Sequence, residues 1–270
     1  MPNPDSNGVR WRFADFISCS GRWSMAADSF LYRTIDRHPQ PIIVRFYRFE
    51  PPAITIGYHQ TASRAIDLVA CAKTGIEIAR RPTGGRALLH RQEINYAVIA
   101  DTARARIFGS GLAAGFWQIS TAVAEGLHQL GVRAEVSDDR IRPGNRSTQR
   151  GSGLCAATTT RYEITCSGRK IAAAAQLRSA GRLLQHGTIY LNEEEITPVE
   201  FFGATAKRTD GKMVSLHTVL GHYVNYDIVI QALKAGFLRK FGHQVNEIPF
   251  NNEERIDIAA VAADSDNLRL

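Results

Sequence analysis

Residues 161–191 read RYEITCSGRKIAAAAQLRSAGRLLQHGTIYL. Three apolar or alternating runs in this stretch are separated by SGR at 167–169 and SAGR at 179–182. Glycine in a short turn between two extended runs is typical of a β-hairpin. The stretch therefore predicts a three-stranded meander, one face of which can carry functional side chains.

The rest of the chain alternates between helical and extended patterns. Apolar residues recur at helical spacing in 23–38, 112–130 and 225–242, and a glycine follows the two longer segments. Shorter runs predict a helix at 64–73 and strands at 41–49, 53–58, 76–80, 87–90 and 94–100. This mixture indicates the α/β (α+β) class, and no linker requires a second domain.

Charge and hydropathy limit the possible partners and compartments. The formal net charge is +7, which favours an acidic partner such as a carrier protein. The basic residues are scattered and no RNA-binding or helix-turn-helix motif accompanies them, so nucleic acid is not expected. Because there is no long apolar run and no signal-peptide pattern at the N-terminus, neither a membrane span nor secretion is expected, and the cytoplasm is the expected compartment.

The four cysteines, Cys19, Cys71, Cys155 and Cys166, lie far apart and form no CxxC pair. Their spacing fits neither a disulfide framework nor a structural metal site, so reduced thiols and no metal are expected. A lone intracellular cysteine is usually a small buried apolar residue, which accounts for Cys19 and Cys71.

The sequence RRPTGGRALLH at 80–90 places a glycine pair between two predicted strands. It matches neither GxGxxG nor GxxxxGK[ST]. The turn is compatible with simple hairpin geometry, with a phosphate cradle, or with a cover over an extended acyl chain. Arg80, Arg81 and Arg86 are candidates to bind a phosphate or a carboxylate beside it.

Cys155 and Lys170 are the candidates for chemistry. Cys155 follows a polar, arginine-rich segment at 137–153 that we expect to be a surface loop, where a positive field would favour the thiolate. Lys170 opens the run IAAAAQ, and its ammonium could stabilise a developing oxyanion. His90 and His186 are candidate bases. Taken one at a time, each of the four is more often a structural residue, and none alone supports an assignment.

Several motifs in order resemble the lipoate–protein ligase and octanoyltransferase superfamily, which shares its catalytic fold with biotin protein ligases. The resemblance covers WSMAADSFL at 23–31, the segment 45–60, RRPTGGRALLH with Glu93, Asn95 and Tyr96 behind it, and GRKIAAAAQLRSAGRLLQHGTIYL. It implies a biotin/lipoate ligase-like catalytic domain at 9–250 with mixed, mostly antiparallel sheets flanked by helices. Residues 1–8 are then a flexible N-terminus and 251–270 a weakly patterned tail.

Within the superfamily, Cys155 stands 170 − 155 = 15 positions before Lys170 and is similar to the cysteine of the Gram-positive-type octanoyltransferases. ATP-using lipoate ligases lack this cysteine, whereas lipoyl amidotransferases keep it and tend to lack the histidine that corresponds to His90. The chain departs from the family pattern at Ala173-Ala174, where Gly-Ser is usual, and at Ala156, where an aromatic residue is usual.

The resemblance implies octanoyl transfer from acyl carrier protein, through a Cys155 thioester, to a lysine of a lipoyl domain or glycine cleavage H protein. No cofactor, metal, nucleic acid or membrane takes part, and a monomer is expected. His90 or His186 would deprotonate the amine. The alternatives are an ATP-dependent ligase, a lipoyl amidotransferase and a non-catalytic lipoyl-binding member. The implied site has Cys155 and Lys170 as catalytic residues, with substrate bound by Arg80, Arg81, Gly84, Gly85, Arg86, His90, Ala173, Gln176, His186 and Gly187.

Overall fold

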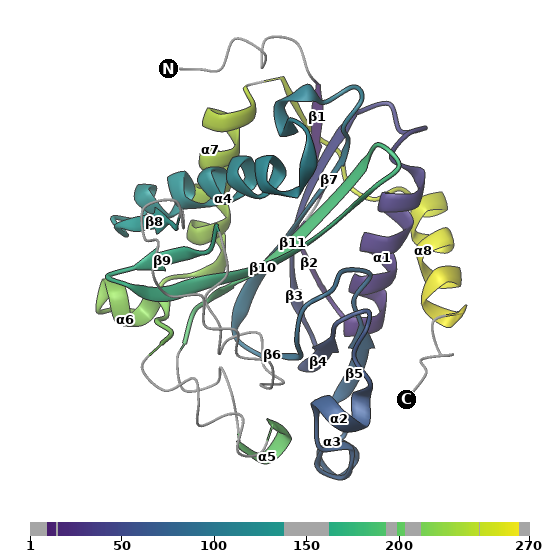
Figure 1. Ribbon diagram of the computed structural model, residues 1–270, viewed down its shortest axis with the longest axis vertical. Coiled ribbons are helices and arrows are strands. Elements are labelled where there is room, and N and C mark those ends of the chain that lie inside the picture. Colours follow the sequence, from purple (N-terminus) through teal and green to yellow (C-terminus); the bar gives the residue numbers. More distant parts are fainter. Residues whose placement is uncertain are drawn as a thin grey trace.

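The computed structural model describes residues 10–14, 16–137, 162–192, 199–202, 212–242 and 244–264. Its centre is a nine-stranded mixed sheet with the strand order β12-β1-β3-β7-β11-β10-β9-β8, and β2 pairs with β3 beside this path (Figure 1). The strands are β1 (Trp11–Phe13), β2 (Ile17–Cys19), β3 (Ile42–Phe49), β7 (Glu93–Asp101), β8 (Ala134–Val136), β9 (Ile164–Cys166), β10 (Arg169–Ser179), β11 (Arg182–Tyr190) and β12 (Val245–Glu247).

The predicted meander is confirmed. Strands β9, β10 and β11 pair antiparallel in sequence order, and β11 continues the antiparallel pairing onto β7. In this register His186 lies between Ala175 of β10 and Ala97 of β7. Since neighbouring residues of a strand point to opposite faces, this pairing fixes the face of the sheet on which the His186 side chain lies.

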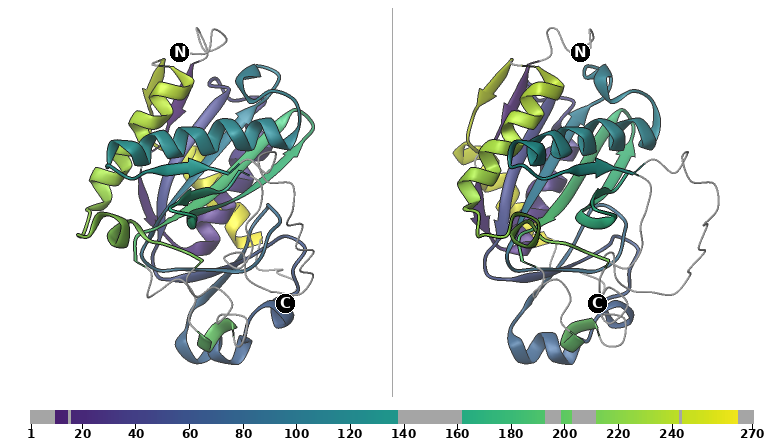
Figure 2. Two further views of the ribbon diagram at one scale, coloured as in Figure 1. Left: turned by 60° about the vertical axis from the view of Figure 1, so that its left-hand side comes forward. Right: turned by 90° about the vertical axis from the view of Figure 1, so that its left-hand side faces the viewer.

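Helices cover both faces of the large sheet (Figure 2). On one face lie α4 (Gly111–Gln129) and α7 (Tyr226–Phe241), and on the other lie α1 (Gly21–Thr34) and α8 (Asn252–Asp264). Alternate side chains of β3 point to opposite faces of the sheet, so the strand contributes to the core on both sides. Val44 and Phe46 pack in the cluster under α4 and α7, whereas Ile43 and Tyr47 pack in the cluster under α1.

A second, three-stranded sheet has the order β5-β4-β6, formed by β5 (Glu77–Arg80), β4 (Ala53–Ile56) and β6 (Leu88–His90). The predicted strands at 87–90 and 94–100 therefore do not pair with each other, because β6 pairs with β4 while β7 joins the large sheet. The Glu93 carboxylate accepts a hydrogen bond from the Arg91 backbone N–H at 2.6 Å, which stabilises the sharp bend between them.

The single helix predicted at 64–73 is two short helices, α2 (Ala62–Ala65) and α3 (Leu68–Thr74). Asp67 separates them because its carboxylate caps the N-terminus of α3, accepting from Val69 N at 2.9 Å and Ala70 N at 3.0 Å. The remaining short elements are the 3₁₀ turn η2 (Arg106–Phe108), α5 (Val199–Phe202) and α6 (Leu216–Leu220).

The C-terminal segment is more regular than its weak pattern suggested. Helix α8 packs on α1, and the buried Arg12 guanidinium donates to the Glu254 carboxylate at 2.6 and 3.0 Å. Within the described ranges, no helix has the length and apolar character needed to cross a bilayer. The predicted loop at 137–153 lies outside the described residues after Ser137, and so do residues 1–8.

Candidate active site

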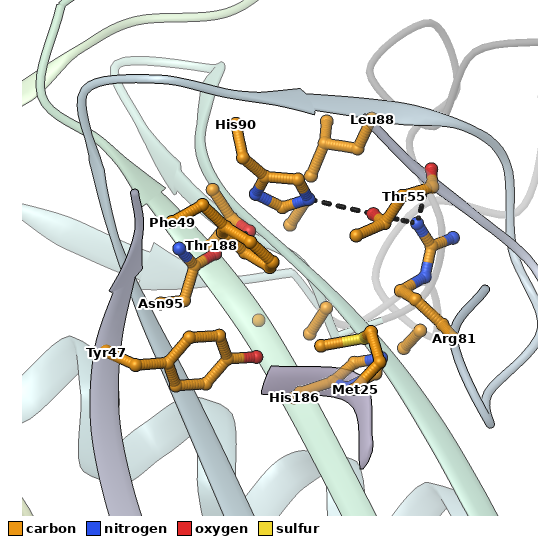
Figure 3. A pocket seen from close by; sticks show the side chains of 14 residues that line it. Met25, Tyr47, Phe49, Thr55, Arg81, Leu88, His90, Asn95, His186 and Thr188 are labelled. Atoms are coloured by element: carbon orange, nitrogen blue, oxygen red, sulfur yellow. Dashed lines mark hydrogen bonds between the residues drawn. The ribbon is translucent and has the colours of Figure 1, made fainter. Parts of the chain in front are cut away.

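A pocket lies between the large sheet, the small sheet and α1, with about 370 Å³ of empty space that is partly open to solvent. Figure 3 shows Thr55, His90 and Arg81 along one side of this pocket and Tyr47, Met25 and His186 along the opposite side. Its lining residues are Met25, Tyr47, Phe49, Thr55, Arg81, Leu88, His90, Asn95, Ala173, Ala174, Ala175, His186, Gly187 and Thr188.

The pocket brings together residues that lie far apart in the sequence. Among the predicted site residues, Arg81, His90, Ala173, His186 and Gly187 line it. The small side chains of the alanine run leave space across β10, as an extended apolar ligand would require. At Gly187 a Cβ atom would lie 2.5 Å from the hydroxyl of Tyr96, which packs under α4 and α7, so the opposite side of the sheet requires glycine here.

His186 is buried and hydrogen-bonded at both ring nitrogens. Its Nδ1 lies 2.9 Å from Asp28 Oδ2, and its Nε2 lies 2.6 Å from the Thr83 hydroxyl. Asp28 in turn accepts from Arg45 Nη1 at 2.7 Å, and both of these charged side chains are fully buried. Burial lowers the pKa of His186, although the hydrogen bond and charge of Asp28 oppose that shift.

His90 has a similar environment on the opposite side of the pocket. Its Nδ1 lies 3.0 Å from Glu93 Oε1, and its Nε2 lies 2.8 Å from the Thr55 hydroxyl. The Thr55 oxygen also accepts from Arg81 Nη1 at 2.7 Å. The Phe49 ring stacks on His90 with the centroids 4.1 Å apart, which closes this side with an apolar surface.

The glycine turn lies between β5 and β6, as predicted, and its neighbouring arginines donate to backbone carbonyls. Arg81 Nη2 donates to the carbonyls of Gly84 and Arg86 at 3.3 and 2.7 Å. Arg80 Nη1 donates to the carbonyls of Gly57, Tyr58 and Gln60. These hydrogen bonds make Arg80 and Arg81 supports of the turn, and their contact with substrate remains a prediction.

The turn approaches the end of β4 very closely. A Cβ atom on Gly57 would lie 2.0 Å from the Gly85 carbonyl oxygen, so this approach requires glycine. Gly85 itself has φ +96, and Tyr58 N donates to the Thr83 carbonyl at 2.9 Å. The glycine pair was singled out from the sequence, but its partner Gly57 was not.

Lys170 and Gln176 lie outside the lining of this pocket. Lys170 is buried, and its Nζ lies 2.6 Å from Glu163 Oε1. The Gln176 amide lies 2.8 Å from that of Gln185, on the side of the sheet where Gly115 of α4 packs. Cys155 is outside the described residues, so its predicted role is untested by the geometry.

The sequence analysis missed the residues that hold the two histidines. Asp28 and Glu93 were quoted within family motifs without a role, and Thr55 and Thr83 were not singled out. A signal for Asp28 was present in WSMAADSFL, because Asp28 follows Met25 by three residues and so shares its predicted buried face. No local pattern marks a threonine as the partner of a distant histidine.

The fold and the sequence assign the class of protein. A solved structure of a putative lipoate protein ligase from T. acidophilum, with bound lipoic acid, matches with a TM-score of 0.71 at 21% identity, over 94% of this chain and 95% of that one. The mixed α/β fold is therefore that of a lipoate ligase catalytic domain, which confirms the fold class expected from the resemblance.

Sequence comparison assigns the family. Residues 20–238 match the lipoyl protein ligase A/B catalytic domain, and the chain belongs to that family. An octanoyltransferase LipM of Lysinibacillus sphaericus is 30% identical over 92% of each chain. The octanoyltransferase LipM of Carboxydothermus hydrogenoformans is 36% identical over 67% of this chain, and the match spans 65% of that relative, just under two thirds of its length.

Proposed function

We propose that this protein moves an octanoyl group from acyl carrier protein, through a thioester on Cys155, to a lysine of a lipoyl domain or of glycine cleavage H protein. Relatives that match most of this chain are named octanoyltransferases, and the protein is accordingly an acyltransferase. The observation that carries the proposal is the largely apolar pocket between the two sheets, which suits an unbranched acyl chain.

In the first step, the Cys155 thiolate attacks the thioester carbonyl of the donor. A carbon–sulfur bond forms to Cys155, the bond to the carrier sulfur breaks, and the carrier leaves as a thiol after taking up a proton. In the second step, the acceptor lysine amine attacks the octanoyl-enzyme. An amide forms, the amine loses a proton, and the Cys155 thiolate is released.

The described residues supply binding and positioning in this scheme. Met25, Phe49 and Leu88 contact the acyl chain, and Ala173 leaves room for it across β10. Lys170, oriented by Glu163, stabilises the oxyanion of each tetrahedral intermediate. Gly84 and Gly85 let the turn close over the thioester, and Arg80 and Arg81 help to position the thioester or the carrier.

The test is intact mass spectrometry after incubation with octanoyl-acyl carrier protein. The wild type should gain one octanoyl group and lose it when a lipoyl domain is added, whereas Cys155→Ser should gain none. Lys170→Ala should acylate at least about a hundredfold more slowly, the effect typical of losing one oxyanion donor. An adduct of equal size on Cys155→Ser would contradict the assignment of the nucleophile.

An ATP-dependent ligase is the second candidate, because a structural neighbour is named a putative lipoate protein ligase and was solved with bound lipoic acid. Such an enzyme would modify the acceptor only with ATP and free acid, and Cys155→Ser would retain activity. A lipoyl amidotransferase would instead accept its acyl group from another lipoylated protein. A non-catalytic member, suggested by Ala173-Ala174, would bind the acylated partner without turnover.

A further inference from the structure

Two hydrogen-bonded chains of the same composition face each other across the pocket. One runs from Asp28 through His186 to Thr83, with distances of 2.9 and 2.6 Å. The other runs from Glu93 through His90 to Thr55, with distances of 3.0 and 2.8 Å. We refer to these two carboxylate–histidine–threonine chains as the Asp28 relay and the Glu93 relay.

Each relay indicates which ring nitrogen carries the proton. An ionised carboxylate can only accept hydrogen bonds, so Nδ1 of each histidine is the donor to its carboxylate. In a neutral ring with its proton on Nδ1, Nε2 can only accept, so the Thr55 hydroxyl donates to His90 Nε2 while its oxygen accepts from Arg81. By the same tautomer argument the Thr83 hydroxyl donates to His186 Nε2 at 2.6 Å, and the Gly84 carbonyl at 3.4 Å is its second, longer acceptor.

This arrangement occupies the nitrogen that a general base would use. The lone pair on Nε2 of His90 and of His186 accepts from a threonine hydroxyl, and both threonines are fully buried. A substrate amine would have to displace a short, buried hydrogen bond before it could transfer its proton. Neither ring is therefore set up to take a proton directly from a ligand.

The two threonines belong to segments beside the pocket: Thr55 lines it, and Thr83 contacts His186, which lines it. Thr83 is in the glycine turn, whereas His186 and Asp28 come from β11 and α1, so the Asp28 relay fastens the turn to the large sheet. Thr55 is in β4 and binds Arg81, whose Nη2 holds the Gly84 and Arg86 carbonyls. The Glu93 relay thus supports the same turn from the side of the small sheet.

We infer that His90 and His186 are positioning residues, which hold the glycine turn at a fixed height above the acyl chain through the Thr55 and Thr83 hydroxyls, and that neither accepts the proton of the acceptor amine. The inference rests on the proposed acyl transfer for its kinetic consequence. The protonation pattern of the two relays does not depend on that function.

The first measurement is the ¹⁵N spectrum of the histidine rings in the full-length wild type, with Thr55→Val and Thr83→Val used to assign the two signals. His90 and His186 should both be neutral rings protonated at Nδ1, and each Nε2 signal should move when its own threonine becomes valine. Rings protonated at Nε2, or signals insensitive to both substitutions, would overturn the inference.

The second measurement is the single-turnover rate of transfer from the octanoyl-enzyme to a lipoyl domain, across about pH 6 to 9. Thr83→Val and Thr55→Val should each slow transfer at least about tenfold, and Thr83→Ser and Thr55→Ser by less than about threefold, because serine keeps the hydroxyl. Each pH profile should stay parallel to that of the wild type. Loss of the fall in rate at low pH in His90→Gln or His186→Gln would identify that histidine as the base, because a general base acts only when it is deprotonated.

Thr102→Val is the matched control, because it removes a hydroxyl that donates to the Gly181 carbonyl at 2.9 Å, away from the pocket lining. It should leave the transfer rate within about twofold of the wild type. If the wild type forms no octanoyl-enzyme, the proposed function fails, while the ring spectrum still decides whether the relays exist as inferred.

Discussion

The two faces of the large sheet are packed in different ways. On one face, α4 and α7 cross through apolar side chains and glycine, and a Cβ atom on Gly236 would lie 2.3 Å from the Ala122 carbonyl oxygen. On the other face, α1 covers a fully buried ion pair between Arg45 and Asp28, which leads to His186 and the pocket. The first face is packed mainly by apolar side chains, with the Gln176–Gln185 amide pair beneath α4, whereas the second carries a buried ion pair next to the site.

The two faces differ in the desolvation cost of their buried groups, which is higher on the face covered by α1. Burying two charges is expensive, and apolar residues of similar size often stabilise a core at least as well as an ion pair does. The Arg45 guanidinium is held by Asp28, by the Ser24 carbonyl at 3.0 Å, and by the Tyr47 ring at 4.2 Å. We attribute the presence of this buried ion pair to its role in keeping Asp28 ionised, so that Asp28 orients His186.

The largest expected effect is that of Arg45→Met, which leaves the buried Asp28 carboxylate without its counter-ion. The free energy of unfolding should fall by about 3–5 kcal/mol, measured by denaturant titration. Adding Asp28→Asn should cost less than the sum of the two single substitutions, because the first change has already broken the pair. Simple additivity would show that the pair is not coupled.

On the opposite face, Gly236→Ala should destabilise by overpacking, since its Cβ atom would also lie 2.4 Å from the Gly126 backbone nitrogen. We expect a loss of about 1–3 kcal/mol in the free energy of unfolding. The histidine ring spectrum of this variant should match that of the wild type. A shifted His186 signal would show that the two faces are coupled through the sheet.

Acid should lower the free energy of unfolding through the face covered by α1, which holds His186, before it affects the face covered by α4 and α7. Because burial lowers the pKa of His186, the unfolded chain binds a proton there at a higher pH than the folded protein does. The contribution of neutral His186 to stability is complete above the ordinary histidine pKa of about 6.5. It is lost as the pH falls from there toward the lowered pKa of the folded protein, by up to about 1.4 kcal/mol per pH unit.

The measurement is the free energy of unfolding of the wild type and of His186→Gln between about pH 7.5 and about pH 5. Asp28, Arg81 and His90 face His186 and are present in both proteins. Burial also lowers the pKa of His38, so only the difference between the two curves reports His186. Parallel curves would contradict the prediction.

The smallest effect should come from an exposed ion pair on the same face. Arg182 Nη2 lies 2.8 Å from Asp36 Oδ2, and the two side chains are 30% and 41% exposed. Because water and salt screen such a pair, Arg182→Ala should leave the denaturation midpoint within experimental error. A loss comparable to that of Arg45→Met would show that burial does not separate the two ion pairs.

Much of the secondary structure could be predicted because it depends on local signals. The helices at 21–34, 111–129 and 226–241 follow their apolar spacing, and the meander follows its two glycine turns. Helix α8 was missed because its residues show little segregation of apolar from polar positions, with only Ile258 buried. Its position depends instead on contacts with α1 and on the pairing of Glu254 with Arg12.

For the candidate site, the sequence by itself determined which segments matter: the glycine turn, the alanine run of β10 and the two histidines. These are recognisable because residue type and spacing are local and ordered motifs are specific. Only the tertiary structure decided that β4 and β6 leave the large sheet, that Gly57 meets Gly85, and that Asp28 and Thr83 hold His186 from 158 and 103 residues away. Such partners are selected by burial and hydrogen-bond satisfaction across the folded chain, for which no local spacing is a signal.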